Sequence, residues 1–207
     1  MNTLTANPSY LSIRSAKAIG RICVIVLTLL LISCTTVLVR TTGTNGIQED
    51  PTKRTAGAIV EDRSIQTKVV VNMKSQQPLF RQTNFDVISH NGVVLLVGQV
   101  ATQTLKDEAT NIASVASQKI KRVHNELEIQ GNTTFLSRGN DSWISTKVRT
   151  QMLANSNVPS GQIRVFTENA TVYLMGIISQ NEGDVAANLA RNVSGVRRVV
   201  KVFEYLN

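Results

Sequence analysis

The sequence predicts an α+β protein built from two tandem units, each with the element order αββαβ. An internal repeat is the first observation: SIQTKVVVNMKSQ, starting at Ser64, matches WISTKVRTQMLAN, starting at Trp143. A second match pairs FDVISHNGVVLLVGQV, starting at Phe85, with IRVFTENATVYLMGII, starting at Ile163. The two matches are 79 and 78 residues apart, so the offset is nearly constant and the chain contains a duplication.

Each unit begins with a segment that has the spacing of an amphipathic helix. Apolar residues recur every four positions in both copies, which places them on one face of a helix. In the first copy they are Ile65, Val69 and Met73, and in the second Ile144, Val148 and Met152.

Two β-rich runs follow each of these helices. HNG joins the runs in the first unit, and Asn-Gly is a strong signal for a tight hairpin turn. ENAT joins them in the second unit, where Ala170 replaces Gly92, so we expect a different type of turn there.

A helical stretch and a closing β-rich run complete each unit. The helices are predicted over residues 104–117 and 181–194, and the closing runs are KRVHNELEI and RRVVKVFEYL. A hairpin, a helical crossover and a third strand imply a mixed three-stranded sheet packed by two helices on one face. Units of about 70 residues are near the lower limit for an independent core, so we expect the two to pack together.

The N-terminal region has the pattern of a lipoprotein signal peptide. Arg14, Lys17 and Arg21 precede ICVIVLTLLLIS, an apolar run that is short for a membrane span. The run ends in LISC, which resembles a bacterial lipobox and predicts cleavage before Cys34 and lipidation of its thiol. An uncleaved anchor helix is the alternative, and either one tethers the chain to a membrane.

These patterns divide the chain into four parts: a signal peptide (residues 1–33), a lipidated Cys34 with a flexible tether (34–58), and the two units (60–130 and 138–207). Loss of the signal peptide removes three cations, so the formal net charge falls from +8 to +5 (8 − 3). This mildly basic charge suits an anionic membrane surface better than nucleic acid.

The sequence offers no pattern for catalysis or for a cofactor. Cys23 leaves with the signal peptide and Cys34 is expected to carry lipid, so no thiol remains for chemistry. His90 and His124 are the only histidines, and neither lies in a metal-ligand spacing. We therefore expect a protein that is not an enzyme and that holds no metal or cofactor.

The repeated units resemble BON domains, through VVLLVGQV and VYLMGII, which end near a glycine, and through KRVHNEL and RRVVKVF, which close each unit. A lipobox followed by two such units, the second opened by NDSWISTKVRTQML, is similar to the dual BON-domain outer-membrane lipoproteins of proteobacteria. The resemblance implies a lipid-anchored, periplasm-facing, non-enzymatic protein that binds anionic phospholipid, supports outer-membrane integrity and associates with division sites. It also implies that the first helix of the second domain, residues 143–153, contacts the membrane.

Trp143, the only tryptophan, does not fall on the apolar stripe of its helix. At about 100° per residue it lies about 140° from the stripe's centre, near Lys147, Thr150 and Leu153. The first unit has Ser64 and Lys74 at the positions of Trp143 and Leu153, so the fold does not require apolar groups there. The predicted site for anionic phospholipid, such as phosphatidylglycerol or cardiolipin, consists of Trp143, Lys147, Thr150, Leu153 and Arg149.

Two alternatives remain open from the residues. In the first alternative, Trp143 is buried between the two units or packed against Phe135 or Leu136 at the start of the helix. Alternatively, the same helix binds a protein, such as an outer-membrane assembly factor or a cell-wall regulator.

Overall fold

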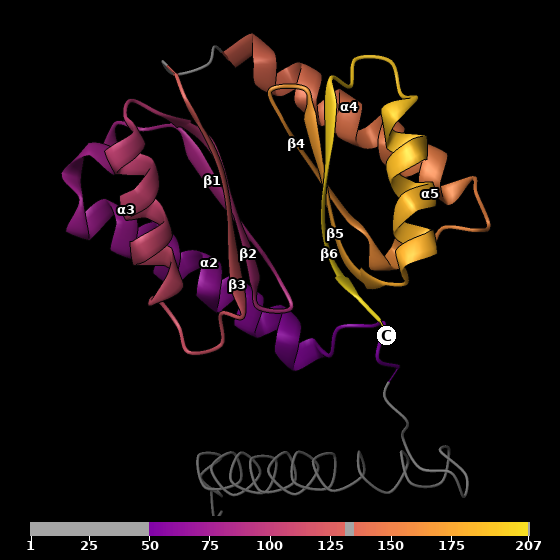
Figure 1. The fold of residues 1–207 in the computed structure, drawn as a ribbon, viewed down its shortest axis with the longest axis horizontal. Coiled ribbons are helices and arrows are strands. Elements are labelled where there is room, and N and C mark those ends of the chain that lie inside the picture. Colours follow the sequence, from indigo (N-terminus) through magenta and orange to yellow (C-terminus); the bar gives the residue numbers. More distant parts are fainter. Residues whose placement is uncertain (1–49, 131–134, 207) are drawn as a thin grey trace, which may run out of the picture. The chain divides into compact units, whose positions relative to one another are not determined.

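The computed structural model describes residues 50–130 and 135–206, with side chains from residue 139 onward in the second range (Figure 1). The predicted signal peptide, Cys34 and most of the predicted tether lie outside the described residues. The first repeat contains α2 (Ala56–Gln76), η2 (Pro78–Arg81), β1 (Phe85–His90), β2 (Val93–Val100), α3 (Gln103–Ser114) and β3 (Arg122–Ile129). The second contains α4 (Phe135–Leu153), η3 (Ser160–Gln162), β4 (Arg164–Glu168), β5 (Thr171–Ile178), α5 (Gln180–Arg191) and β6 (Arg198–Tyr205).

The predicted αββαβ order is therefore confirmed in both repeats, with an unpredicted 3-10 turn before each first strand. Helix α2 begins at Ala56, so the last residues of the predicted tether are helical. The Thr55 side chain caps this helix by accepting a hydrogen bond from the Ala58 N–H.

Each repeat forms a mixed three-stranded sheet, as predicted. The strand orders are β1-β2-β3 and β4-β5-β6. In each sheet the first two strands are antiparallel, with Val87 opposite Leu96 and Val165 opposite Leu174, and the helical crossover makes the last two parallel.

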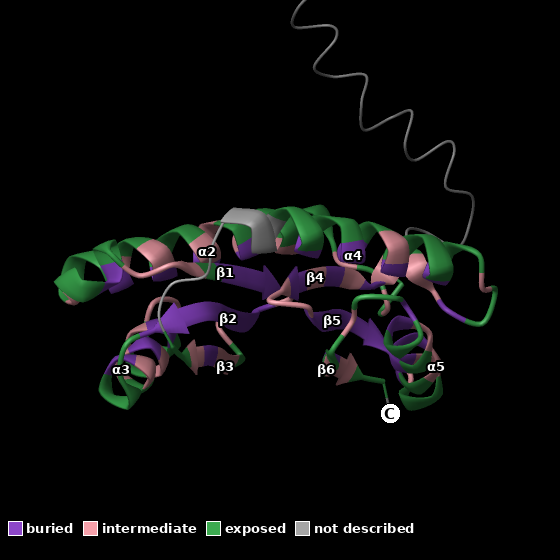
Figure 2. Ribbon diagram, turned by 90° about the horizontal axis from the view of Figure 1, so that it is seen from above, coloured by how far each residue is buried: buried purple, intermediate pink, exposed green. Residues whose placement is uncertain are grey.

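Two of the three hydrophobic cores lie between a sheet and its own helices. The stripe residues of α2 and α4 are at most 1% exposed, which confirms the predicted spacing. They pack on alternate residues of the central strands, Val94 and Leu96 in one repeat and Val172 and Leu174 in the other. Figure 2 shows the result: the central strands β2 and β5 are buried, and the outer faces of the helices are exposed.

The third core lies between the two sheets. Leu95 and Val97 of β2 point away from their own helices, since side chains alternate along a strand, and meet Tyr173 and Met175 of β5. The expectation that the two units pack together is thus confirmed, and within residues 50–207 the sheets face one another with the helices outside (Figure 1).

Reciprocal polar contacts surround this shared core. The Asn91 side-chain amide donates to Glu204 at 2.8 Å, and its repeat equivalent, Asn169, donates to Glu128 at 3.2 Å. Because Glu204 and Glu128 are themselves equivalent positions, the contacts show that an approximate two-fold relation connects the repeats.

The second hairpin turn is not of a different type, so that sequence expectation is wrong. Asn91 and Gly92 have φ angles of 54° and 79°, and Asn169 and Ala170 have 49° and 57°. Both pairs lie in the left-handed region of a type I′ turn. Ala170 adopts it because the buried Asp141 carboxylate accepts hydrogen bonds from the Asn169 and Ala170 N–H groups, each at 2.8 Å.

This geometry predicts opposite effects for exchanging alanine and glycine in the two turns. Ala170→Gly should raise the free energy of unfolding by up to about 1 kcal/mol, because a left-handed alanine costs about 1–2 kcal/mol and glycine's extra entropy offsets part of the gain. Gly92→Ala should lower it, because the new Cβ would lie 2.5 Å from the Lys119 carbonyl oxygen. Urea denaturation of the two variants measures both changes, and a less stable Ala170→Gly protein would contradict the argument.

Candidate functional site on helix α4

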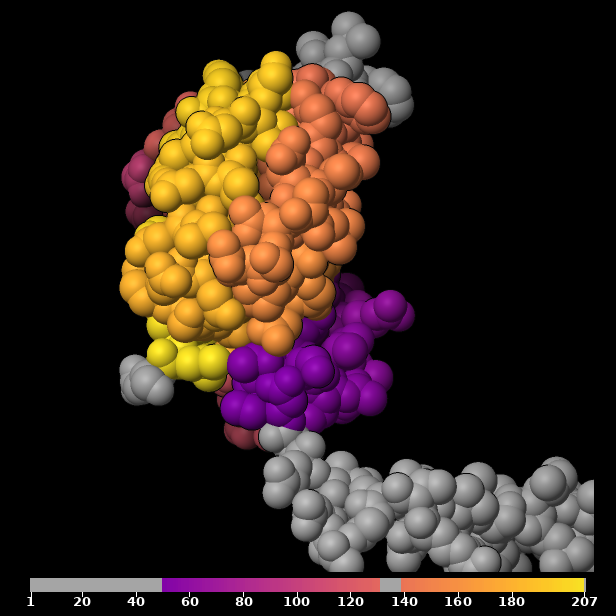
Figure 3. All heavy atoms as spheres, turned by 90° about the vertical axis from the view of Figure 1, so that its right-hand side faces the viewer, coloured from indigo at the N-terminus to yellow at the C-terminus, as the bar shows by residue number. Residues whose placement is uncertain are grey.

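Helix α4 presents two large apolar side chains to solvent. Burial of Ile144, Val148 and Met152 against the sheet turns the opposite face outward, where Trp143 is 62% exposed and Leu153 is 73% exposed. In the space-filling view the orange-red surface of α4 is open to the viewer along one edge (Figure 3). The predicted outward position of Trp143 is confirmed, and its burial between the repeats is excluded.

The threonines on this face use their hydroxyl protons within the helix. Thr146 donates to the Ser142 carbonyl and Thr150 to the Thr146 carbonyl, each at 3.0 Å. Such bonds to the preceding turn leave no hydroxyl donor for a ligand, although the oxygen can still accept. Thr150 therefore adds little polar recognition, and the face is more apolar than its composition suggests.

Lys147 supplies a positive charge at the edge of this face. Its side chain is half-buried, and its ammonium donates to the Ser194 carbonyl in the turn after α5. This contact with a neutral acceptor fixes the cation one helical turn from Trp143 without neutralising it.

Arg149 lies apart from the other predicted residues. Its guanidinium donates to the Val165 carbonyl of β4 at 2.6 Å and lines two clefts beside that strand. On a helix Arg149 is about 120° from Trp143, so the spacing alone indicates the separation. The structure groups Trp143, Lys147, Thr150 and Leu153 on one face and places Arg149 elsewhere.

Basic side chains and a histidine from both repeats form a cluster that the sequence pattern did not predict. His90, 5% exposed at the end of β1, faces Arg54 and Arg164. Burial and the nearby Arg54 lower the pKa of His90 to about 4, so the imidazole is neutral at pH 7. The sequence offered one signal for this cluster, the charges of Arg54 and Arg164. These charges could have been compared with the residues at the equivalent positions of the other repeat.

The described residues contain no group of three or more His, Cys, Asp and Glu side chains that could hold a metal ion. His124 has a ring Nε2 that is buried without a hydrogen-bond partner, and burial also lowers the pKa of this histidine. In the part of the chain that the structure describes, no helix is both long enough and apolar enough to cross a bilayer.

The protein is a two-domain α+β protein, because two αββαβ repeats share a core. Its candidate site is an exposed helix face that carries a tryptophan. The chain belongs to the BON domain family, which matches residues 61–131 and 140–207.

Three curated relatives place the chain within this family. It is 33% identical over 161 residues to the outer membrane lipoprotein DolP of Haemophilus influenzae, covering 78% of this chain and 82% of DolP. It is 35% identical over 153 residues to the 21 kDa hemolysin of Actinobacillus pleuropneumoniae, covering 74% of this chain and 78% of the hemolysin. The osmotically-inducible protein Y of Escherichia coli K12 is 26% identical over 157 residues, covering 74% and 77%.

Proposed function

We propose that this protein is a lipoprotein of the outer membrane that faces the periplasm and binds anionic phospholipid through the exposed face of α4. Trp143, 62% exposed beside a fixed lysine, is the observation that carries the proposal. The similarity to DolP, an outer membrane lipoprotein, supports the location and the lipid anchor on Cys34. On the same family resemblance, we propose that the protein supports outer-membrane integrity and associates with division sites.

An exposed indole beside a cation suits the interfacial layer of a membrane. The ring can enter at headgroup depth while the ammonium stays near the lipid phosphates. The first repeat has Ser64 and Lys74 where α4 has Trp143 and Leu153, so folding does not explain these two apolar residues.

The expected affinity of this face is weak. Burying the exposed indole area, on the order of 100–150 Å², contributes about 3 kcal/mol, and the nearby cation adds roughly 1 kcal/mol at an anionic surface. A total of about 4 kcal/mol corresponds to a Kd of about 1 mM. A lipid anchor on Cys34 compensates, because tethering raises the effective concentration of the protein at the membrane.

Fluorescence of Trp143 tests the proposal with a single reporter. Residues 50–207 form a compact unit that contains all three cores, so this portion can be studied without the N-terminal segment. We expect a blue shift with vesicles containing phosphatidylglycerol, little change with phosphatidylcholine alone, and loss of the shift at high salt.

A matched pair of lysine variants gives the control. Lys147→Gln should weaken vesicle binding about fivefold, the equivalent of roughly 1 kcal/mol. Lys68→Gln, at the equivalent position of α2 in the other repeat, removes the same charge and should leave binding unchanged. A Trp143 emission maximum that shifts with neither kind of vesicle would overturn lipid binding and favour a protein partner for the same face.

A further inference from the structure

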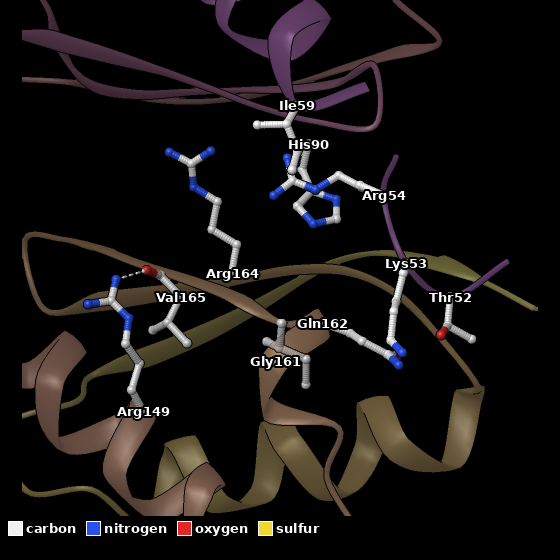
Figure 4. Close-up of a pocket in the computed structure, with 11 residues that line it drawn as sticks. Thr52, Lys53, Arg54, Ile59, His90, Arg149, Gly161, Gln162, Arg164 and Val165 are labelled. Carbon is white, nitrogen blue, oxygen red and sulfur yellow. Dashed lines mark hydrogen bonds between the residues drawn. The ribbon is translucent and has the colours of Figure 1, made fainter. Parts of the chain in front are cut away.

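A cleft with a strongly positive lining lies where the start of α2 and the end of β1 meet η3 and the start of β4. Its volume is about 470 Å³. Figure 3 shows the indigo N-terminal part of the first repeat against the orange residues of the second, and Figure 4 shows the lining side chains. We call it the basic cleft, and the residues that matter to its chemistry are Lys53, Arg54, His90, Arg149 and Arg164, with Ile59 and Val165 as apolar walls.

The lining of the basic cleft carries more positive charge than its ion pairs neutralise. Among the described residues that line it there are four cations and no carboxylate. Asp62 pairs with Arg54 at 2.8 Å, and Asp50 pairs with Lys53 at 3.2 Å, which leaves two cations in excess (4 − 2).

Both excess cations are oriented by neutral acceptors. Arg164 donates to the Ser89 carbonyl at 3.1 Å, and Arg149 donates to the Val165 carbonyl at 2.6 Å. Neither forms an ion pair with a described side chain. A guanidinium has five N–H donors in a planar fork, so each keeps donors available for a ligand.

Burial and neighbouring guanidinium groups both lower pKa values in the cleft. Burial first, and then the nearby Arg54 and Arg149, lower the pKa of Arg164, while Asp62 acts in the opposite direction. For His90, burial and the charges of Arg54 and Arg164 outweigh Asp62 and Glu204. The contribution of the guanidinium groups to these shifts, as distinct from that of burial, is the part that a bound anion would oppose.

The other repeat shows that folding does not require this charge. Asp86 and Glu168 occupy the positions equivalent to Arg164 and His90, and both line a second cleft of about 410 Å³ together with Asp141 and with Arg149, which lines both clefts. The same fold therefore accepts the opposite charge at these positions, and the positive lining of the basic cleft is a local property of this sequence.

We propose that the basic cleft binds a phosphate group, carried by a soluble phosphate ester or by a phospholipid headgroup. Guanidinium groups match phosphate oxygens through paired, charge-assisted hydrogen bonds. The cleft is larger than one phosphate and lies in the size range of small-ligand sites, so an ester substituent fits against Ile59 and Val165.

Calorimetry and proton NMR of residues 50–207 test this site with inorganic phosphate and glycerol 3-phosphate at constant ionic strength. Binding should raise the pKa of His90 above its value of about 4, because an anion stabilises the imidazolium. Arg164→Gln should weaken phosphate binding at least about tenfold. Lys53→Gln, an exposed substitution that cannot disturb the core, should weaken it several-fold.

Arg63→Gln is the matched control, because it removes an exposed cation from α2 outside the cleft. The site would be overturned by equal phosphate affinity in the original protein and in all three variants. It would also be overturned by a His90 resonance that does not change when phosphate is added.

Vesicles separate the two sources of phosphate. Competition between phosphatidylglycerol vesicles and glycerol 3-phosphate at His90 would assign the site to a lipid headgroup, and vesicle binding that leaves His90 unchanged would assign it to a soluble ester. His90 reports on the cleft and Trp143 on α4, so either proposal can fail without the other.

Discussion

Asp62→Asn is expected to lower the free energy of unfolding by about 3–5 kcal/mol, the usual cost of breaking a buried, paired charge. The Asp62 carboxylate is 2% exposed and accepts four hydrogen bonds. The donors are the Ser89 hydroxyl (2.7 Å), the Asn91 N–H (2.8 Å), the Gly92 N–H (3.0 Å) and the Arg54 guanidinium (2.8 Å). An asparagine of the same shape places a donor where the carboxylate has an acceptor, so at least one buried N–H loses its partner.

The same carboxylate makes stability depend on acid pH. Burial by itself raises the pKa of Asp62, but the hydrogen bonds from Gly92, Ser89, Asn91 and Arg54 outweigh burial and hold it below its ordinary 3.8. A folded pKa below the unfolded pKa stabilises the protein above the unfolded value, and this contribution disappears as the pH falls through the folded value. The difference in stability between the original protein and Asp62→Asn should therefore shrink below about pH 4.

Chemical denaturation at pH 7 and at pH 3 measures both effects. Asp107→Asn is the control, because the Asp107 carboxylate is exposed and accepts from Gln103 on the same helix. An Asp62→Asn protein as stable as Asp107→Asn at pH 7 would show that the carboxylate does not support the turn.

Tyr173→Ala is expected to cost about 3–5 kcal/mol and to weaken both repeats, as truncation of a large buried ring does. Tyr173 lies in β5 of the second repeat, is 1% exposed and packs in the core between the sheets with Leu95 and Val97 of β2. Because this core is shared, amide hydrogen exchange should accelerate in β2 as well as in β5.

The comparison variant is Tyr205→Ala, which truncates a ring that is 40% exposed at the end of β6. Its loss of stability should be less than half as large and confined to the second repeat. Faster exchange in β4–β6 alone after Tyr173→Ala would mean that the two repeats are stable independently.

The order of the elements was predictable because each depends on short-range patterns. The stride of four in α2 and α4 identifies their buried faces, and the Asn-Gly pair identifies the first hairpin. The same helical spacing places Trp143 outside the buried stripe, and the structure confirms that the Trp143 side chain is exposed. Lipid binding by the α4 face remains a prediction.

The second turn shows where a local pattern fails. Ala170 on its own disfavours a left-handed turn, but Asp141, nearly thirty residues earlier in the chain, provides two hydrogen bonds that stabilise it. The repeat-equivalent Asp62 and Asp141 were visible in the sequence, but a polar residue near a helix start reads equally well as an ordinary exposed residue.

The sequence by itself determined the duplication, the elements of each repeat and the outward position of Trp143, because periodicity and turn residues are local properties. Only the tertiary structure decided that the sheets share a core, that the Arg149 guanidinium binds the Val165 carbonyl of β4, and that Arg54, His90 and Arg164 meet in one cleft. These contacts join residues that are distant in the chain, and their formation depends on which exposed faces of the two repeats come together. No short-range pattern specifies that choice, because it is made by the complementarity of whole surfaces.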